Sequence, residues 1–394
     1  MLLCEEHEML RQTVREFVEK EVTPVGYYEL EQKGEFPKEL FEKLVKMGYV
    51  GMSFPEEYGG MGADCLSTSI VATELAFGWP SLQLIWSANE SLSGFPIKQF
   101  GNEEQKKRFL PGLAQGKILG CYALTEPDAG SDAASIKTTA ELREFHSGSG
   151  WVLNGTKTFI TNADMASMGI VFARVKSSSK RTSRKRYEGI TAFIIDCHDS
   201  RLCIKAPIHI HNIPKWGLLS SHFCQVVLED LLIPESDVLG EVGNGFPIAM
   251  ETLNNGRVNI AAQAVGIARR ALHEAKEYAK MRKVFGKTIM EFDEKAKELA
   301  RLQTKADAAW LLVMCAAQAR DKGLSDYITK ASQAKLFASE IAVKCAMFNY
   351  RIQGGFGYTR ESIAMSIFHD ALATITYEGT SDIQELTIAK SFRN

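Results

Sequence analysis

The segments WVLNGTKTFI (residues 151–160), MGIVFARV (168–175), ITAFIID (190–196) and FCQVVLED (223–230) decide the fold class of this 394-residue chain. Each is short and rich in β-branched and aromatic residues, and glycine, asparagine, serine and aspartate separate them. This texture is typical of neighbouring β-strands joined by turns. We therefore predict a central β domain over residues 119–236.

Helical sequence precedes this β region. In residues 5–22, apolar side chains recur at steps of three and four residues, which is the spacing of one buried helix face. Similar stretches continue to about residue 117, interrupted by the turn-forming sequence PEEYGGMGAD at 55–64. We therefore predict an N-terminal helical domain over residues 1–118.

Helical sequence also follows the β region. The segments at 259–282 and 296–323 are rich in alanine, glutamate, lysine and leucine, and each predicts a helix of about twenty residues or more, long enough to form part of a bundle. We predict a C-terminal helical bundle over residues 237–394. The fold class is therefore α+β and multidomain, in the order α, β, α.

The composition excludes several kinds of protein. Hydrophobic residues make up 45% and charged residues 24%, and the formal net charge is -2, so no overall charge draws the chain to nucleic acid. The basic stretch KSSSKRTSRKR (176–186) lies between two predicted strands, and we interpret it as a solvated hairpin loop rather than as a patch for an acidic partner. The eight cysteines form no CxxC pair and no cluster with histidine, which predicts free thiols and no metal site.

The sequence predicts no membrane span, because it contains no run of about 18 or more apolar residues. Its start, MLLCEEHEML, lacks the basic residues and the long apolar core of a secretory signal. We expect a cytoplasmic protein, or a mitochondrial matrix protein if the source is eukaryotic.

Three segments carry small and hydroxyl residues that could meet a polar ring or a phosphate. They are CYALTEPDAGSD (121–132), KTFITNA (157–163) and RIQGGFGYTRE (351–361). Each signal is weak alone: GGFGY is not the dinucleotide fingerprint, and a glycine turn between two helices explains it equally well.

Together with RKVFGK (282–287) and YEGTSDIQ (377–384), these segments resemble the acyl-CoA dehydrogenase family in order and spacing, and LNNGRVNIAAQAVGIARRAL (253–272) is most similar to its short-chain members. The resemblance covers nearly the whole chain. It implies a helical domain, a β-barrel-like domain and a four-helix domain, usually assembled as a homotetramer. It also implies FAD as the cofactor, an acyl-CoA substrate and an electron-transferring flavoprotein as the partner.

The resemblance also implies roles for individual residues. Those expected to bind FAD are Tyr122, Leu124, Thr125, Gly130, Ser131, Phe159, Thr161, Arg282, Phe285, Arg351, Gly354, Gly355, Thr380 and Asp382. Among these, Arg282, Phe285 and the 351–355 turn are expected to reach the FAD of a neighbouring subunit. Those expected to border the substrate are Ser131, Asn254, Arg257, Gly379 and Glu90.

Glu378 matches the catalytic base of the family. The α-proton of a thioester is only weakly acidic, so its removal needs a carboxylate held at that carbon, and burial of the carboxylate would raise its pKa and strengthen the base. Taken alone, Glu378 could simply start the helix that follows it. Some relatives carry the base one position before Arg257 instead, but that position is Gly256 here.

The sequence departs from the family pattern at several positions. KWGLLSS (215–221) has Trp216 and Leu219 where methionine and arginine are common, Phe292 and Asp293 follow the FGK motif, and Arg351 replaces a frequent glutamine. These departures affect the expected FAD and subunit contacts but not the base.

Residues 76–92, AFGWPSLQLIWSANESL, resemble the segment that lines the acyl pocket of relatives. The segment contains no arginine or lysine to hold a distal carboxylate, and Trp79 and Trp86 add bulk, so we expect a short, branched or cyclic acyl group. Glu90 is interpreted as a surface or salt-bridged residue. The alternative is a second acid in the pocket, as in relatives that form a conjugated diene.

Other functions are compatible with the same residues. The same base and flavin would serve an enoyl-CoA reductase, or an oxidase that passes electrons to oxygen. A non-enzymatic scaffold that retains FAD is a further alternative, but Glu378, Thr125, Ser131 and Arg282 are all present.

Overall fold

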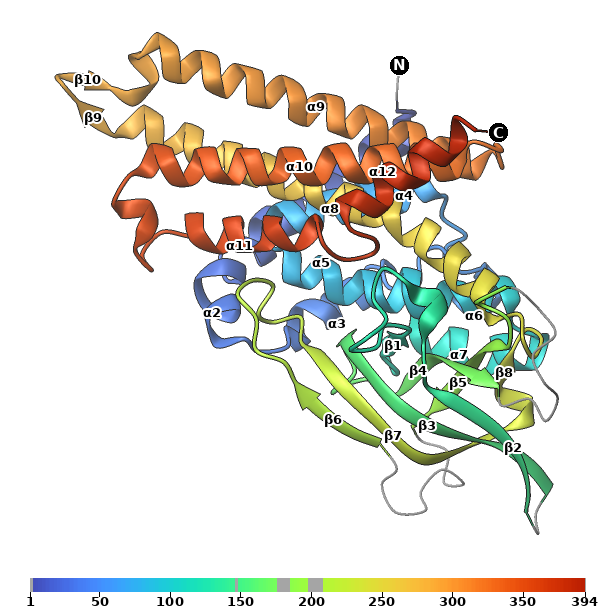
Figure 1. Ribbon diagram of the computed structural model, residues 1–394. Helices are drawn as coiled ribbons and strands as arrows, with labels where there is room; N and C mark the ends of the chain where they lie inside the picture. Colours follow the sequence, from blue (N-terminus) through green and yellow to red (C-terminus); the bar gives the residue numbers. More distant parts are fainter. Residues whose placement is uncertain (1–2, 146–147, 176–184, 198–207, 394) are drawn as a thin grey trace.

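In the computed structural model, residues 3–145, 148–175, 185–197 and 208–393 are described. A helical layer built from both ends of the chain lies on one side of the molecule, and a β-sheet domain lies on the other (Figure 1). The predicted fold class is confirmed by this architecture. Most of the basic stretch at 176–186 lies outside the described residues.

Short helices build the N-terminal part of the chain. They are α1 (Glu5–Phe17), α2 (Glu31–Lys33), α3 (Lys38–Lys46), α4 (Cys65–Gly78), α5 (Pro80–Ser87), α6 (Phe95–Phe100) and α7 (Glu103–Ala114). Residues 88–94 form a π-helical turn between α5 and α6. The side chain of Asp64 caps α4 by accepting a hydrogen bond from the Ser67 N–H (2.7 Å), which satisfies one of the free donors at the helix start.

One mixed sheet forms the β domain. Its strands are β1 (Gly120–Ala123), β2 (Thr139–Phe145), β3 (Gly148–Thr161), β4 (Met168–Val175), β5 (Ile190–Asp196), β6 (Ile208–Asn212), β7 (Phe223–Pro234) and β8 (Val238–Leu239). The strand order is β6-β7-β3-β2-β4-β5-β8, with β1 parallel to β4. The four segments that predicted the β domain are all strands.

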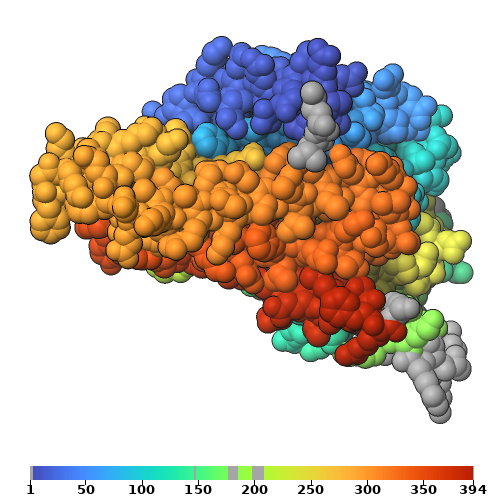
Figure 2. Space-filling model, turned by 90° about the horizontal axis from the view of Figure 1, so that it is seen from above, coloured from blue at the N-terminus to red at the C-terminus, as the bar shows by residue number. Residues whose placement is uncertain are grey.

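Long helices build the C-terminal part. They are α8 (Gly245–Met281), α9 (Asp293–Asp321), α10 (Tyr327–Gln353), α11 (Ala364–Thr374) and α12 (Ser381–Ser391). A hairpin of β9 (Lys283–Val284) and β10 (Lys287–Thr288) joins α8 to α9 and projects at one end of the molecule (Figures 1 and 2). Helix α8 has 37 residues and starts earlier than the alanine-rich pattern predicts. Pro247 allows this start, since proline is tolerated in the first turn of a helix.

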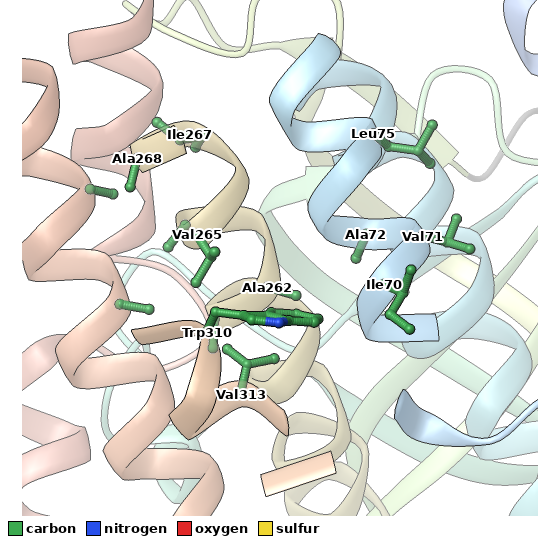
Figure 3. Packing of buried hydrophobic residues seen from close by; sticks show 14 of the residues in the cluster. Ile70, Val71, Ala72, Leu75, Ala262, Val265, Ile267, Ala268, Trp310 and Val313 are labelled. Carbon is green, nitrogen blue, oxygen red and sulfur yellow. The ribbon is translucent and has the colours of Figure 1, made fainter. Parts of the chain in front are cut away.

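The main hydrophobic core joins the two helical parts. Figure 3 shows α4, α8 and α9 packed through small and β-branched side chains around Trp310. Gly266 of α8 permits this approach, because a methyl group there would overlap the backbone oxygen of Thr73 on α4. The N-terminal helices and the C-terminal bundle are therefore held in one packed unit, and the sheet domain is seated against it.

Candidate active site

Glu378 lies in the turn between α11 and α12. Its backbone is left-handed, with φ of 51°, and the next residue, Gly379, has φ of 92°. A non-glycine residue rarely adopts positive φ, and such strain is concentrated at functional sites. Thr380 ends the turn by accepting a hydrogen bond from the Ile383 N–H at the start of α12 (3.4 Å).

The carboxylate of Glu378 packs against α8 at Gly256. A methyl group at Gly256 would overlap Glu378 Oε2. This oxygen is shielded from solvent and has no hydrogen-bond partner among the described residues. Burial raises the pKa of Glu378 to about 8, while the charges of Lys335 and Arg257 act in the opposite direction.

Two buried cations flank the Glu378 turn. Arg257 on α8 donates a hydrogen bond to Asn254 Oδ1 (2.7 Å), and both side chains are buried. Lys335 on α10 is fully buried and donates to the Gly379 carbonyl (2.7 Å). Their positive charges favour an anionic group in the turn, so the site combines a desolvated carboxylate with two adjacent cations.

The two β segments expected at a flavin lie side by side. The Thr158 N–H donates to the Thr125 carbonyl (2.9 Å), which joins the end of β1 to β3. Next to this contact, Lys157 is buried and ion-paired with Glu126 (2.8 Å). A side-chain ion pair therefore joins the two segments in addition to the backbone hydrogen bond.

A bulge in β3 turns Phe159 out of the sheet. The register between β3 and β7 shifts between Lys157 and Ile160, and Phe159 has φ of 59° and is 58% exposed. Its ring lies 5.3 Å from that of Phe223. Bulges are known to redirect side chains near active sites, and this one presents an aromatic face next to the Thr125 strand end.

The end of β1 also faces the Glu378 turn. Burial raises the pKa of Tyr122 well above its usual value, and the nearby Glu378 charge raises it further. Leu124 is buried. In contrast, Gly130 and Ser131 lie on an exposed turn after a bridge between Glu126 and Ala129.

The β9–β10 hairpin and the turn after α10 hold the predicted cofactor residues that lie away from Glu378, at the projecting end of the bundle (Figure 1). Arg282 and Phe285 lie in the β9–β10 hairpin, and Phe285 is 97% exposed. The turn that follows α10 holds Gly354 and Gly355, and Arg351 just before it contacts Glu298 (3.4 Å). The structure therefore separates the predicted residues into two groups. Asp382 belongs to the first group, in the opening turn of α12.

Glu90 is not a surface residue, so that part of our interpretation was wrong. It is 2% exposed, and one carboxylate oxygen accepts a hydrogen bond from the Ser53 N–H (2.8 Å). The π-helical turn at 88–94 carries it inward, toward a cavity of about 80 Å³ that Lys98 and Arg320 also line. Burial raises the pKa of Glu90. No pattern in the sequence predicts this π-helical turn.

Sequence reasoning missed three residues that support the Glu378 turn. Gln384 donates to the carbonyls of both Gly379 (2.9 Å) and Glu378 (3.3 Å). Gln263, buried in α8, accepts a hydrogen bond from the Tyr377 hydroxyl and donates to the Pro80 carbonyl (3.3 Å). Lys335 is the third. A single lysine among the alanines of a buried helix face was the one sequence signal that could have revealed it.

The residues around Glu378 fit a large polar ligand that carries an aromatic ring. Four of their buried atoms have no hydrogen-bond partner within the described parts of the chain: Glu378 Oε2, Arg257 Nε, Ser381 Oγ and Gln384 Oε1. Buried polar groups are normally paired, and the exposed Phe159 ring and the Thr125 strand end lie on the β side of the same site. This donor and acceptor set suits a flavin and a thioester better than a metal ion.

Comparison with known proteins places this arrangement in a family. Three family models match consecutively: acyl-CoA dehydrogenase N-terminal domain (residues 4–117), middle domain (121–231) and C-terminal domain (243–392). The chain is 40% identical to an acyl-CoA dehydrogenase of Bacillus subtilis, over 99% of this chain and 98% of that one. It is 39% identical to a short-chain specific acyl-CoA dehydrogenase of Clostridium acetobutylicum, over 99% of each.

Other relatives widen the range of reactions and supply structures. Subunit CarC of a caffeyl-CoA reductase–Etf complex from Acetobacterium woodii is 37% identical, over 99% of this chain and 98% of that one. Butyryl-CoA dehydrogenase from Megasphaera elsdenii superimposes with a TM-score of 0.91 at 36% identity, covering 100% and 99% of the two chains. An FAD-complexed acyl-CoA dehydrogenase from Bacillus anthracis gives 0.89 at 31% identity, covering 99% and 68%.

The three-domain fold and a buried carboxylate beside a flavin-type cradle are those of an oxidoreductase family. The chain belongs to the acyl-CoA dehydrogenase family. Our predictions of the family, of an enzyme and of FAD as its cofactor are confirmed. No helix within the described residues is long and apolar enough to cross a membrane.

Proposed function

We propose that this protein oxidises an acyl-CoA thioester between its α and β carbons, with Glu378 as the base that removes the α-proton. The observation that carries the proposal is the Glu378 carboxylate, which is desolvated, flanked by cations and unpaired at Oε2 within the described residues. A weak carbon acid needs such a base held in position. FAD, when bound, supplies the acceptor for the β-hydride.

The chain's own residues provide the surroundings of that reaction. The backbone at Tyr122–Thr125 and the segment Phe159–Thr161 would hold the flavin ring, and Thr380 and Asp382 would complete its contacts at the start of α12. Gly130 and Ser131 would border the pantetheine arm. Asn254 and Arg257 would contact the substrate on the CoA side, and Gly379 would border the thioester.

The acyl group is proposed to be short. Leu84, Leu218 and Ile260 form a small buried apolar cluster against Tyr377, next to Glu378. Trp79 and Trp86, which we expected to fill the pocket, belong instead to the main core, where their indole N–H groups bind Glu31 (2.9 Å) and the Tyr49 carbonyl (2.8 Å). The three aliphatic side chains of that cluster therefore limit the acyl chain, because overpacking is costly to relieve.

A diene-forming activity on cyclic acyl-CoAs is a second candidate, and the burial of Glu90 favours it. Glu90 Oε2 is buried without a hydrogen-bond partner in the described part of the chain, and Glu90 lines a cavity together with Asn255 and Asn259 of α8, the helix that also carries Gly256. If Glu90 has this role, Glu90→Gln should cripple turnover of a cyclohexenyl-CoA and spare a saturated acyl-CoA.

Electrons are proposed to leave through an electron-transferring flavoprotein. The relative from Acetobacterium woodii belongs to a reductase–Etf complex, so the same fold serves the reductive direction, and enoyl-CoA reduction is the alternative physiological reaction. We also propose a homotetramer, as the family resemblance implies, and the almost completely exposed Phe285 ring at the hairpin tip is available for a contact between subunits.

An anaerobic titration tests the proposal. FAD-loaded protein is titrated with linear, branched, cyclic and dicarboxylic acyl-CoAs, and the flavin absorbance is followed. We expect short saturated acyl-CoAs to bleach the flavin and dicarboxylic ones to leave it oxidised. Bleaching by none of the acyl-CoAs, with reoxidation by enoyl-CoAs only, would assign the reductive direction instead.

A further inference from the structure

Lys335 is a buried cation that the proposed reaction does not itself require. It lies on the face of α10 that also carries Ala331, Ala334 and Ala338, and all four side chains are fully buried. A lysine is rarely buried completely unless its charge has a partner. The surroundings of its ammonium group therefore indicate what the residue does.

The ammonium group of Lys335 holds the turn that carries Glu378. It donates to the Gly379 carbonyl (2.7 Å), which also accepts from Gln384 Nε2 (2.9 Å). Glu378 and Gly379 both have positive φ, so this carbonyl belongs to a strained turn that needs outside support. Lys335 provides that support from α10, a different element from either helix that the turn connects.

Few charged or titratable groups face Glu378. Arg257 approaches from α8, Lys335 from α10 and Tyr122 from β1, and Tyr377 is its neighbour in the turn. The pKa values of both tyrosines are raised well above their usual value by burial, so their phenols stay neutral. Among the residues that the structure describes, the two cations therefore remain to stabilise the ionised carboxylate.

The two cations differ in chemistry. The guanidinium of Arg257 stays charged and also binds Asn254, whereas burial lowers the pKa of Lys335 to about 8 and the charge of Glu378 raises it. Lys335 and Glu378 therefore stabilise each other's charged forms and titrate in the same pH range.

We propose that Lys335 is a positioning residue for Glu378: its ammonium group holds the Gly379 carbonyl, and its charge stabilises the ionised form of the adjacent carboxylate, the form that accepts the α-proton. This inference rests on the proposed role of Glu378 as the base. It adds a second requirement to the site, a buried lysine outside the flavin and CoA contacts.

The charge can be tested by its effect on the pH dependence. Without the Lys335 charge, the carboxylate of Glu378 loses a stabilising partner, and its pKa rises further. Because only the ionised carboxylate accepts a proton, the acid limb of the rate profile moves to higher pH. For a nearby charge in a partly buried site, we expect a shift of about one pH unit or more.

The experiment compares Lys335→Met, Lys335→Arg and the matched control Lys344→Met, since Lys344 lies on the same helix with its side chain 57% exposed. FAD content, thermal unfolding and the pH profile of flavin reduction are measured for each. The carboxyl of Glu378 is also titrated by infrared difference spectroscopy, using Glu378→Gln to identify its band. We expect the midpoint to rise in Lys335→Met and to stay near wild type in Lys335→Arg and Lys344→Met.

An unchanged infrared midpoint in folded Lys335→Met would overturn the inference, whatever the activity of the variant. If that variant does not fold, the infrared midpoint of Glu378 is measured in Lys335→Gln instead. Glutamine keeps a donor for the Gly379 carbonyl but lacks the charge, so an unchanged midpoint in this variant would equally overturn the inference. Failure of the proposed function gives a different result: Glu378→Gln would still reduce the flavin, while the infrared shift would persist.

Discussion

At the scale of single residues, the position of the Glu378 carboxylate depends on Gly256, which has no side chain. Gly256 leaves the space that the carboxylate occupies. We expect the base at Glu378 because position 256 holds no acidic side chain here, and Gly256 leaves room for the carboxylate.

We predict that Gly256→Ala lowers the rate of flavin reduction by about a hundredfold, because a displacement of about 1 Å at a reacting group has that effect. Folding should be preserved, since alanine favours a helix over glycine. The matched control is Gly266→Ala on the same helix, whose methyl group would overlap the Thr73 backbone. It should lower the melting temperature instead. A Gly256→Ala enzyme with wild-type reduction kinetics would contradict the proposed position of the carboxylate.

At the scale of elements, two buried carboxylates hold the 215–221 segment against the helical parts. Asp370 of α11 accepts from the Tyr27 hydroxyl (2.9 Å) and the Leu218 N–H (2.7 Å). Glu31 of α2 accepts from the Leu219 N–H (2.6 Å). Because these bonds use the backbone, the unusual leucine at 219 leaves them intact. The same clamp fixes α11, which leads directly into the Glu378 turn.

We predict that Glu31→Gln destabilises the protein by about 2–4 kcal/mol. The two carboxylate oxygens of Glu31 accept hydrogen bonds from three donors. An amide NH₂ cannot accept, so at least one of these donors would lose its partner in the variant. Glu29→Gln, at an exposed position two residues away, is the control and should change stability by less than about 0.5 kcal/mol. Chemical denaturation measures both. Equal stabilities would show that the clamp contributes little.

Sequence patterns predicted the elements better than their boundaries. The alternation of turn residues with β-branched runs located the strands, because that pattern reflects burial on a sheet. The bulge that exposes Phe159 and the π-helical turn that buries Glu90 were not predicted, since both depend on one extra residue in a regular element and leave no periodic signal. These irregular turns carry two of the candidate site residues.

At the scale of the whole molecule, the predicted cofactor residues form two groups, one around the Glu378 turn and the neighbouring β1 and β3 strands, the other at the projecting end of the C-terminal bundle (Figure 1). The motif spacing alone could not show this separation, because it arises from the length of α8 and α10. Lys335 and Gln263 were missed for a related reason: each acts across a helix interface on residues distant in sequence, and a single chain gives no sign of such pairs.

We predict that FAD retention depends on assembly. Arg282→Ala should lose FAD on dilution, because a guanidinium is suited to bind a diphosphate and Arg282 is exposed at the projecting hairpin. Arg301→Ala, exposed on the neighbouring helix, should keep its FAD. Analytical ultracentrifugation with flavin absorbance follows both properties together. A monomeric Arg282→Ala protein that remains fully loaded would contradict this arrangement.

The central claim, that Glu378 removes the α-proton, is tested most directly by anaerobic stopped-flow measurement of flavin reduction in FAD-loaded Glu378→Gln. The amide preserves the shape of the side chain and cannot accept the proton, so acyl-CoA should still bind while the reduction rate falls by at least about a hundredfold. In the wild type, the rate should rise with pH through about 8, as the buried carboxyl ionises. Reduction by Glu378→Gln at more than about a hundredth of the wild-type rate would place the base elsewhere.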